Sequence, residues 1–226
     1  MLIAEDLLLL ITDDDSGRLV ASAGEVDVAL GGAMLVELAQ RGRTGVAEPG
    51  GPVRKGRVEV LDRTPTDDPL LDAALATAVA KEGKRPQDVV TALGKRQREA
   101  LYARLVEAGI LRAEQGKVLG VFPTKRWPAE DAAHEEEVRA AVVTALRHGL
   151  AGDERTAAIV SLLHALKAVH KAAPPAVVGL AKREMNANAK RIADGDWASA
   201  AVRKAIDSTN AAMAATAGGG AVAGSS

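Results

Sequence analysis

The stretch Ala29–Arg43 (ALGGAMLVELAQRGR) constrains the fold more than any other part of the chain. Its apolar residues recur at helical spacing and would form one face of a helix: Met34, Leu35, Leu38 and Ala39. Its polar residues fall on the opposite face: Glu37, Gln40 and Arg41. Gly42 is a C-terminal stop signal, and the pair Gly31-Gly32 lets another backbone approach closely. A helix this apolar is stable only when it is buried, so we expect the rest of the chain to surround it.

The composition indicates a mainly α protein with an aliphatic core. Of the 226 residues 47% are hydrophobic, but only 2% are aromatic, which suits helix packing on helix. The net charge of −1 gives no global attraction to nucleic acid or to an anionic membrane, so any such binding needs a local basic patch. The chain has no cysteine, which excludes disulfides and thiolate chemistry and is consistent with a cytoplasmic location.

Apolar periodicity and turn residues predict one helical domain with small β-hairpins over residues 1–213. Further helices are expected at Leu2–Ile11, Asp68-Pro69 to Gly83, Pro86–Leu93, Lys95–Glu107, Ala129–His148, Glu154–Lys171, Ala176–Ala193 and from Trp197 towards Met213. Short strands are expected at Arg18–Ala21, Thr44–Ala47 and Arg57–Leu61, with a hairpin pairing Ile110–Arg112 and Lys117–Phe122. The Ala/Gly/Ser-rich end, Ala214–Ser226, is expected to be disordered.

Membrane-spanning and secretory segments are not expected. No segment reaches the roughly 20 apolar residues of a spanning helix. The apolar run Leu7–Ile11 is short and follows Glu5 and Asp6, where a signal peptide carries positive charge. We therefore expect a soluble protein, and any membrane contact to be peripheral.

Catalytic and metal-binding motifs are missing, so an enzyme is the weakest hypothesis. The four histidines lack the spacing of a zinc site, and no nucleophile motif is visible. Gly31-Gly32, if it opens a helix, is a place where a phosphate could bind, but close packing is the commoner reason for such a pair. We expect no metal and no cofactor.

The strongest functional signal is basic. Lys95 and Arg98 are three residues apart on a predicted helix, so they share a face and could hold one phosphate group together. A second basic cluster, Arg54, Lys55 and Arg57, lies in and beside a Pro/Gly-rich loop. From the spacing alone, a solvated helix surface is the favoured interpretation.

The order of these pieces resembles the Golgi phosphoprotein 3 family of phosphoinositide-binding, membrane-peripheral proteins. The resemblance runs over nearly the whole chain, from Leu2 to about Met213, and rests on four stretches within it: Leu2–Ile11 (LIAEDLLLLI), Leu30–Arg43 (LGGAMLVELAQRGR), Leu70–Leu75 (LLDAAL) and Leu105–Leu111 (LVEAGIL). It implies a helical domain around a buried core helix that binds phosphatidylinositol 4-phosphate, or a similar phosphoinositide, in a basic pocket. It also implies an apolar hairpin that enters the bilayer and contributes to homo-oligomer contacts.

Transferred by position, the family's two basic pocket residues fall on Lys95 and Arg98. Its pocket tryptophan falls near Ser22, and its third arginine falls on Gly31, so both are replaced; Arg54, Lys55 or Arg57 could compensate. The hairpin falls on Glu114–Lys125, and its membrane-contacting residues are Val118, Leu119, Val121, Phe122 and the nearby Trp127. The composition is typical of a bacterial member, which we expect on the cytoplasmic membrane face; a eukaryotic member would be at the Golgi.

Two other classes of function stay open at this point. A helix followed by Gly and a β-hairpin, as in Leu101–Phe122, is also the pattern of a winged helix-turn-helix, with Arg96 and Arg98 facing DNA phosphates. The near-neutral charge is against it, and we expect no nucleic acid partner. The third class is a protein-interaction scaffold that kept the fold and lost the lipid pocket.

Overall fold

The computed structural model describes residues 1–13, 16–118 and 122–194, and for 115–118 and 122–125 it describes the backbone alone. Within this part the protein is mainly helical, as predicted. The helices are α1 Ile3–Leu10, α2 Ala23–Gln40, α3 Pro69–Ala80, α4 Pro86–Leu93, α5 Gln97–Glu107, α6 Ala133–His148, α7 Glu154–Ala165, α8 Val169–Ala172, α9 Pro175–Val178 and α10 Lys182–Ala193. The predicted last helix and the predicted disordered tail lie outside the described residues.

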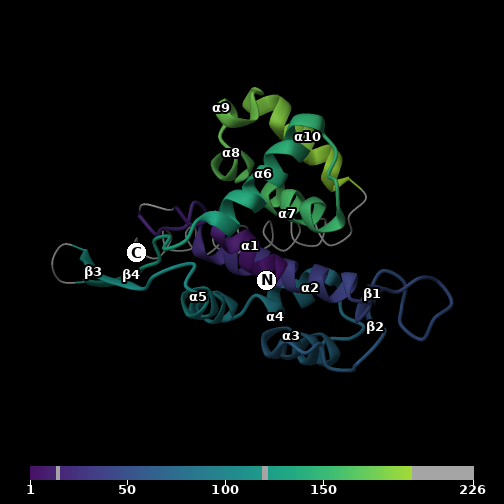
Figure 1. The fold of residues 1–226 in the computed structure, drawn as a ribbon. Coiled ribbons are helices and arrows are strands. Elements are labelled where there is room, and N and C mark those ends of the chain that lie inside the picture. The colour runs from purple at the N-terminus through teal and green to yellow at the C-terminus, as the bar shows by residue number, and fades with distance from the viewer. Residues whose placement is uncertain (14–15, 119–121, 195–226) are drawn as a thin grey trace, which may run out of the picture.

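Helices α1 and α2 form the centre of the molecule, with α3, α4 and α5 on one side and α6 to α10 on the other (Figure 1). Every residue of α1 is buried. The core helix α2 is longer than predicted: it begins at Ala23, because the Ser22 hydroxyl accepts a hydrogen bond from the Glu25 amide and caps the helix. Gly31 and Gly32 therefore lie inside a buried helix, and the prediction that they could open a helix and receive a phosphate is wrong.

The close approach predicted at these glycines is confirmed. A Cβ atom on Gly31 would lie 2.1 Å from the Val90 carbonyl oxygen and 2.5 Å from the Gly94 nitrogen. A Cβ atom on Gly94 would in turn lie 2.0 Å from the Asp27 carbonyl oxygen. Since no side chain fits between them, the backbones of α2 and of the end of α4 are in direct contact. Helix α5 begins three residues after Gly94, so this contact also positions its start.

Three of the predicted helices begin or end elsewhere, because single residues take left-handed backbone conformations. Arg96 has φ of 63°, so the predicted basic helix Lys95–Glu107 begins only at Gln97. Lys167 has φ of 55° and Gly179 has φ of 78°, and each interrupts a segment that periodicity alone predicts as one helix. These breaks leave two short helices: α8 lies against α7 and α10, and α9 lies against α6.

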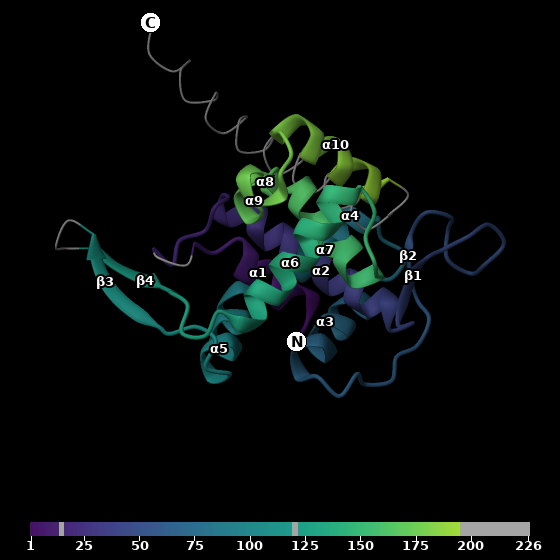
Figure 2. The same cartoon turned by 45° about the horizontal axis from the view of Figure 1, so that its top comes forward.

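Two antiparallel hairpins lie at opposite ends of the molecule (Figures 1 and 2). Strand β1 (Thr44–Val46) pairs with β2 (Val58–Val60), as predicted. Strand β3 (Glu114–Val118) pairs with β4 (Phe122–Arg126), so the predicted pairing of Ile110–Arg112 with Lys117–Phe122 is wrong, whereas the position implied by the family resemblance is correct. The predicted strand Arg18–Ala21 is not formed; only an isolated bridge between Thr12 and Leu19 is present there.

Two further observations concern membrane-spanning helices and metal sites in the described part of the chain. None of its helices has both the length and the apolar character needed to cross a bilayer. Within the same residues, no three histidine, aspartate or glutamate side chains gather where a metal ion could be held.

Candidate functional site

An open pocket of about 380 Å³ lies where three separate segments meet: the α1–α2 connection, α5, and the chain just after β4. It is lined by Gly17, Arg18, Leu19, Ala21, Ala23, Arg98, Tyr102 and Trp127. The lining combines two arginines, an aromatic pair and the first residue of the 18-residue helix α2. This combination of positive charge and a flat apolar surface suits an anionic ligand that carries a ring.

The α1–α2 connection reaches the pocket through a turn at Gly17. The Gly17 amide donates a hydrogen bond to the Asp13 carbonyl (2.7 Å), and the Asp13 amide donates one to the Arg18 carbonyl (2.8 Å). Gly17 has φ of 60°, and a Cβ atom there would lie 2.3 Å from the Trp127 nitrogen. Glycine is therefore required for the turn to contact the end of β4, and the turn leaves Arg18 exposed on the pocket wall.

The aromatic part of the pocket is a stacked pair. The rings of Tyr102 and Trp127 lie 4.6 Å apart between centroids, with an angle of 6° between their planes. Thr12 donates to the Leu8 carbonyl (2.7 Å), so the Tyr102 hydroxyl donates to Thr12 (2.9 Å). Burial raises the pKa of Tyr102, against the opposing effects of Thr12 and Arg98. The stack is thus a neutral, anchored surface, with Trp127 only half-buried.

Arg98 supplies the charge that is best placed to bind a ligand. Its Nε atom lies 3.5 Å from Asp27 Oδ1, too long for a good hydrogen bond, and its side chain is 29% exposed. Within the described contacts this is its one ion pair, so most of the five N–H groups of its guanidinium stay available. The α2 N-terminus, which reaches the pocket at Ala23, adds the positive end of a helix dipole.

The structure brings some of the predicted site residues to this pocket and leaves others out. Arg98 lines it, whereas Lys95 is exposed in the turn before α5 and is not among the lining residues. The helical spacing argued for Lys95 and Arg98 does not apply, because the helix begins after Lys95. Their shared role in binding phosphate stays a prediction.

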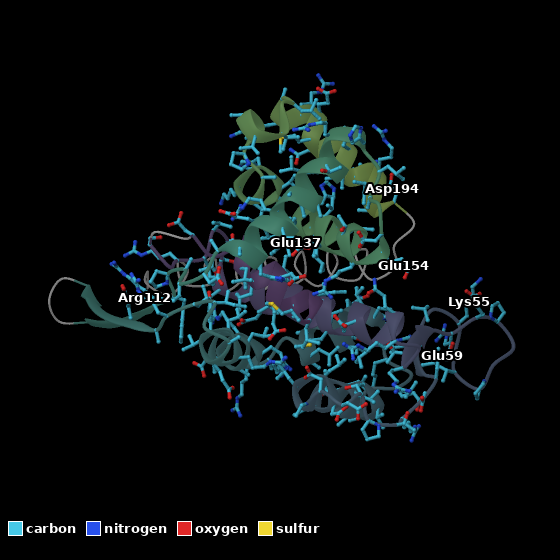
Figure 3. The ribbon with its side chains drawn as sticks, in the orientation of Figure 1. Lys55, Glu59, Arg112, Glu137, Glu154 and Asp194 are labelled. Carbon is cyan, nitrogen blue, oxygen red and sulfur yellow. The ribbon has the colours of Figure 1, made fainter. Side chains whose placement is uncertain are left out.

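The second basic cluster lies far from the pocket. Arg54 and Lys55 are exposed in the loop between β1 and β2, and Arg57 is half-buried just before β2. Figure 3 shows Lys55 at the opposite end of the molecule from Arg112, which precedes β3 and pairs with Glu114 (2.9 Å). Arg54, Lys55 and Arg57 therefore do not complete the pocket described above.

The hairpin residues are only partly described. Val118 pairs with Phe122 in backbone register, while Leu119 and Val121 lie outside the described residues. Trp127 follows β4 at the base of this hairpin rather than its tip, and its ring packs against Tyr102. A membrane contact by these five residues stays a prediction.

The two positions where the family's pocket residues are replaced have clear structural roles here. Ser22 caps α2. Gly31 lies at the backbone contact between α2 and α4, where an arginine side chain has no room. Arg18 and Trp127 bring a charge and an indole to the pocket from other parts of the chain. Sequence reasoning missed Arg18, because a lone arginine in a predicted strand carries no signal.

Comparisons with known proteins give a match over most of the chain. A family model described as Golgi phosphoprotein 3 (GPP34) matches residues 3–209. The chain is also similar to a protein from Eremothecium gossypii named vacuolar protein sorting-associated protein 74, with 28% identity over 162 residues. That match covers 63% of this chain and 48% of the relative, so the chain spans about half the length of the curated protein it matches.

Proposed function

Because the chain belongs to the Golgi phosphoprotein 3 family, we propose that it is a non-enzymatic, peripheral membrane protein that binds an anionic phospholipid headgroup. Phosphatidylinositol 4-phosphate, or a similar phosphoinositide, is the headgroup that the family resemblance implies. The ligand's phosphate is bound by Arg98 and Arg18, and its inositol ring lies against the Tyr102–Trp127 stack.

The observation that carries the proposal is the state of Arg98. An arginine whose guanidinium has one loose ion pair, beside a pocket with an aromatic wall, is available to hold a phosphate with two parallel hydrogen bonds. The Ala23 and Gly24 amides in the first turn of α2 add donors of the kind that anions bind at helix N-termini, whereas the Glu25 amide is already bonded to Ser22. Asp27 offsets part of this positive charge.

Two arginines do not hold a protein on a membrane by themselves. Each basic residue near an anionic surface contributes roughly 1 kcal/mol, so stable binding needs a second anchor. The β3–β4 hairpin extends away from the helical body in both views, and Trp127 of the pocket directly follows it (Figures 1 and 2). We propose that the hairpin supplies the apolar anchor while the pocket recognises the headgroup.

Vesicle co-sedimentation tests the proposal. Wild type, Arg98→Ala and Arg18→Ala are compared on phosphatidylcholine vesicles with and without phosphatidylinositol 4-phosphate. Each substitution is expected to weaken phosphoinositide-dependent binding roughly fivefold, which corresponds to about 1 kcal/mol.

Lys55→Ala is the matched control, because it removes the same charge at the other end of the molecule (Figure 3). Equal sedimentation of Arg98→Ala and Lys55→Ala would contradict the pocket. A salt-sensitive shift of duplex DNA without vesicle binding would favour the winged-helix alternative instead.

A further inference from the structure

A carboxylate lies beside the arginine that faces the pocket. Asp27 comes from the second turn of α2, and its Oδ1 atom lies 3.5 Å from Arg98 Nε, with both side chains partly exposed at 36% and 29%. The backbone of α2 at Asp27 is packed against the chain just before α5. The Asp27 carbonyl lies so close to Gly94 that a Cβ atom on Gly94 would have no room. Asp27 therefore cannot move away from Arg98 by a shift of its helix.

This carboxylate has no structural role that explains it. It caps no helix, and among the described contacts its one partner is Arg98. Burial raises the pKa of Asp27 in spite of the nearby Arg98, so the surroundings of this side chain work against its charged form. Glu25 of the same helix differs, because it accepts a hydrogen bond from the Ser22 hydroxyl (2.6 Å) at the helix cap.

We propose that Asp27, which lies behind Arg98 and is not itself among the residues lining the pocket, acts through Arg98 to limit the charge of the headgroup that the pocket accepts; this inference rests on the proposed function. A bound phosphate and the Asp27 carboxylate compete for the same guanidinium and repel each other. Their repulsion grows in proportion to the charge of the headgroup, so headgroups with several phosphate groups lose most affinity. Asp27 thus favours headgroups with one phosphate monoester over those with two.

The test measures how much Asp27→Asn improves binding to headgroups of increasing charge. Asparagine keeps the shape of the side chain and removes its charge. The probes are phosphatidylcholine vesicles with phosphatidylglycerol, phosphatidylinositol 4-phosphate or phosphatidylinositol 4,5-bisphosphate. The gain is expected to be smallest for phosphatidylglycerol, about fivefold for the monophosphate and larger still for the bisphosphate.

The control is Glu99→Gln, which removes an equal charge from an exposed position next to Arg98 on α5. Asp27→Asn is also measured in the Arg98→Ala background, where competition for the guanidinium no longer exists and the gain is expected to shrink. A gain no larger than that of Glu99→Gln, a gain independent of headgroup charge, or the same gain without Arg98 overturns the inference.

The two proposals fail differently. If Arg98→Ala binds phosphoinositide vesicles as well as wild type, the headgroup pocket itself is wrong. If Arg98→Ala weakens binding but Asp27→Asn brings no charge-dependent gain, the pocket stands and the role of Asp27 is refuted. Soluble inositol 1,4-bisphosphate, added as a competitor, separates recognition of the headgroup from attraction to the vesicle surface.

Discussion

Two arginines on α5 each form an ion pair with an aspartate, but one pair is tight and the other is loose. Arg104 Nη1 lies 2.8 Å from both carboxylate oxygens of Asp68, and its Nε lies 3.0 Å from Glu5, which is buried. Arg98, less than two turns earlier, has one contact of 3.5 Å with Asp27. The first arginine ties α5 to the core, while the second is held loosely at the edge of a pocket. The difference separates a charge used for structure from a charge available for binding.

The pKa values of the two aspartates reflect this difference. Burial acts to raise both, but at Asp68 the hydrogen bonds from Arg104 and from the Leu71 and Leu70 amides outweigh it and lower the pKa. At Asp27 burial prevails over the one long contact with Arg98 and the pKa is raised. Folding therefore favours the charged form of Asp68 and the neutral form of Asp27.

The largest effect is expected from removing the structural arginine. Arg104→Ala leaves the buried Glu5 without its cationic partner and is expected to lower the free energy of unfolding by about 3 kcal/mol. Arg98→Ala removes the same side chain type from the same helix and is expected to stay within about 0.5 kcal/mol of wild type. Urea denaturation measures both. Equal losses for the two variants would remove the distinction on which the pocket rests.

The next effect concerns the backbone contact that fixes α5. In Gly31→Ala the new Cβ meets the Val90 carbonyl, and we expect a loss of about 2 kcal/mol in the free energy of unfolding. Gly24→Ala is the control in the first turn of the same helix, where nothing lies within 4 Å, and we expect a gain of about 0.5 kcal/mol. Thermal unfolding distinguishes them. A stable Gly31→Ala variant would mean that α2 and α4 are not in close contact.

The smallest changes in the free energy of unfolding are expected from substituting the two aspartates, and the two changes should have opposite signs. The lowered pKa of Asp68 stabilises the fold above its ordinary value of 3.8, and this contribution is lost as the pH falls through the lowered value. Asp68→Asn is therefore expected to cost about 1 kcal/mol at pH 7 and progressively less as the pH falls through the lowered pKa. The raised pKa of Asp27 acts the other way, so Asp27→Asn is expected to be stabilising at pH 7 and neutral below pH 3.8.

Urea denaturation of both aspartate variants at neutral and acidic pH measures these contributions. The two variants should move away from wild type in opposite directions as the pH rises. Shifts of the same sign at pH 7 would show that the two pairs are alike after all.

The central helices could be predicted from the sequence because their apolar residues repeat at helical spacing, as Met34, Leu35 and Leu38 do. The close contact at Gly31 could be predicted because glycine has no Cβ atom and lets another backbone approach. The breaks at Arg96 and Lys167 could not, because both are non-glycine residues in the left-handed region, which such residues rarely adopt. The apolar repeat carries no signal for such a backbone conformation.

The candidate site was predictable only in part. Arg98 belongs to a basic pair that stands out in the sequence. Arg18 and Trp127 join it only because Gly17 brings the α1–α2 connection against the end of β4, a contact between segments more than one hundred residues apart. The Tyr102–Trp127 stack depends on how the β3–β4 hairpin returns to α5, which local sequence does not specify.

The most direct test of the headgroup pocket is a fluorescence titration of Trp127. The chain has two tryptophans, so in Trp197→Phe the signal comes from Trp127 alone. Soluble glycerophosphoinositol 4-phosphate should change this fluorescence saturably, and Arg98→Ala should abolish the change while Lys55→Ala preserves it. A titration that leaves Trp127 unchanged, or one that Arg98→Ala does not alter, would contradict the account.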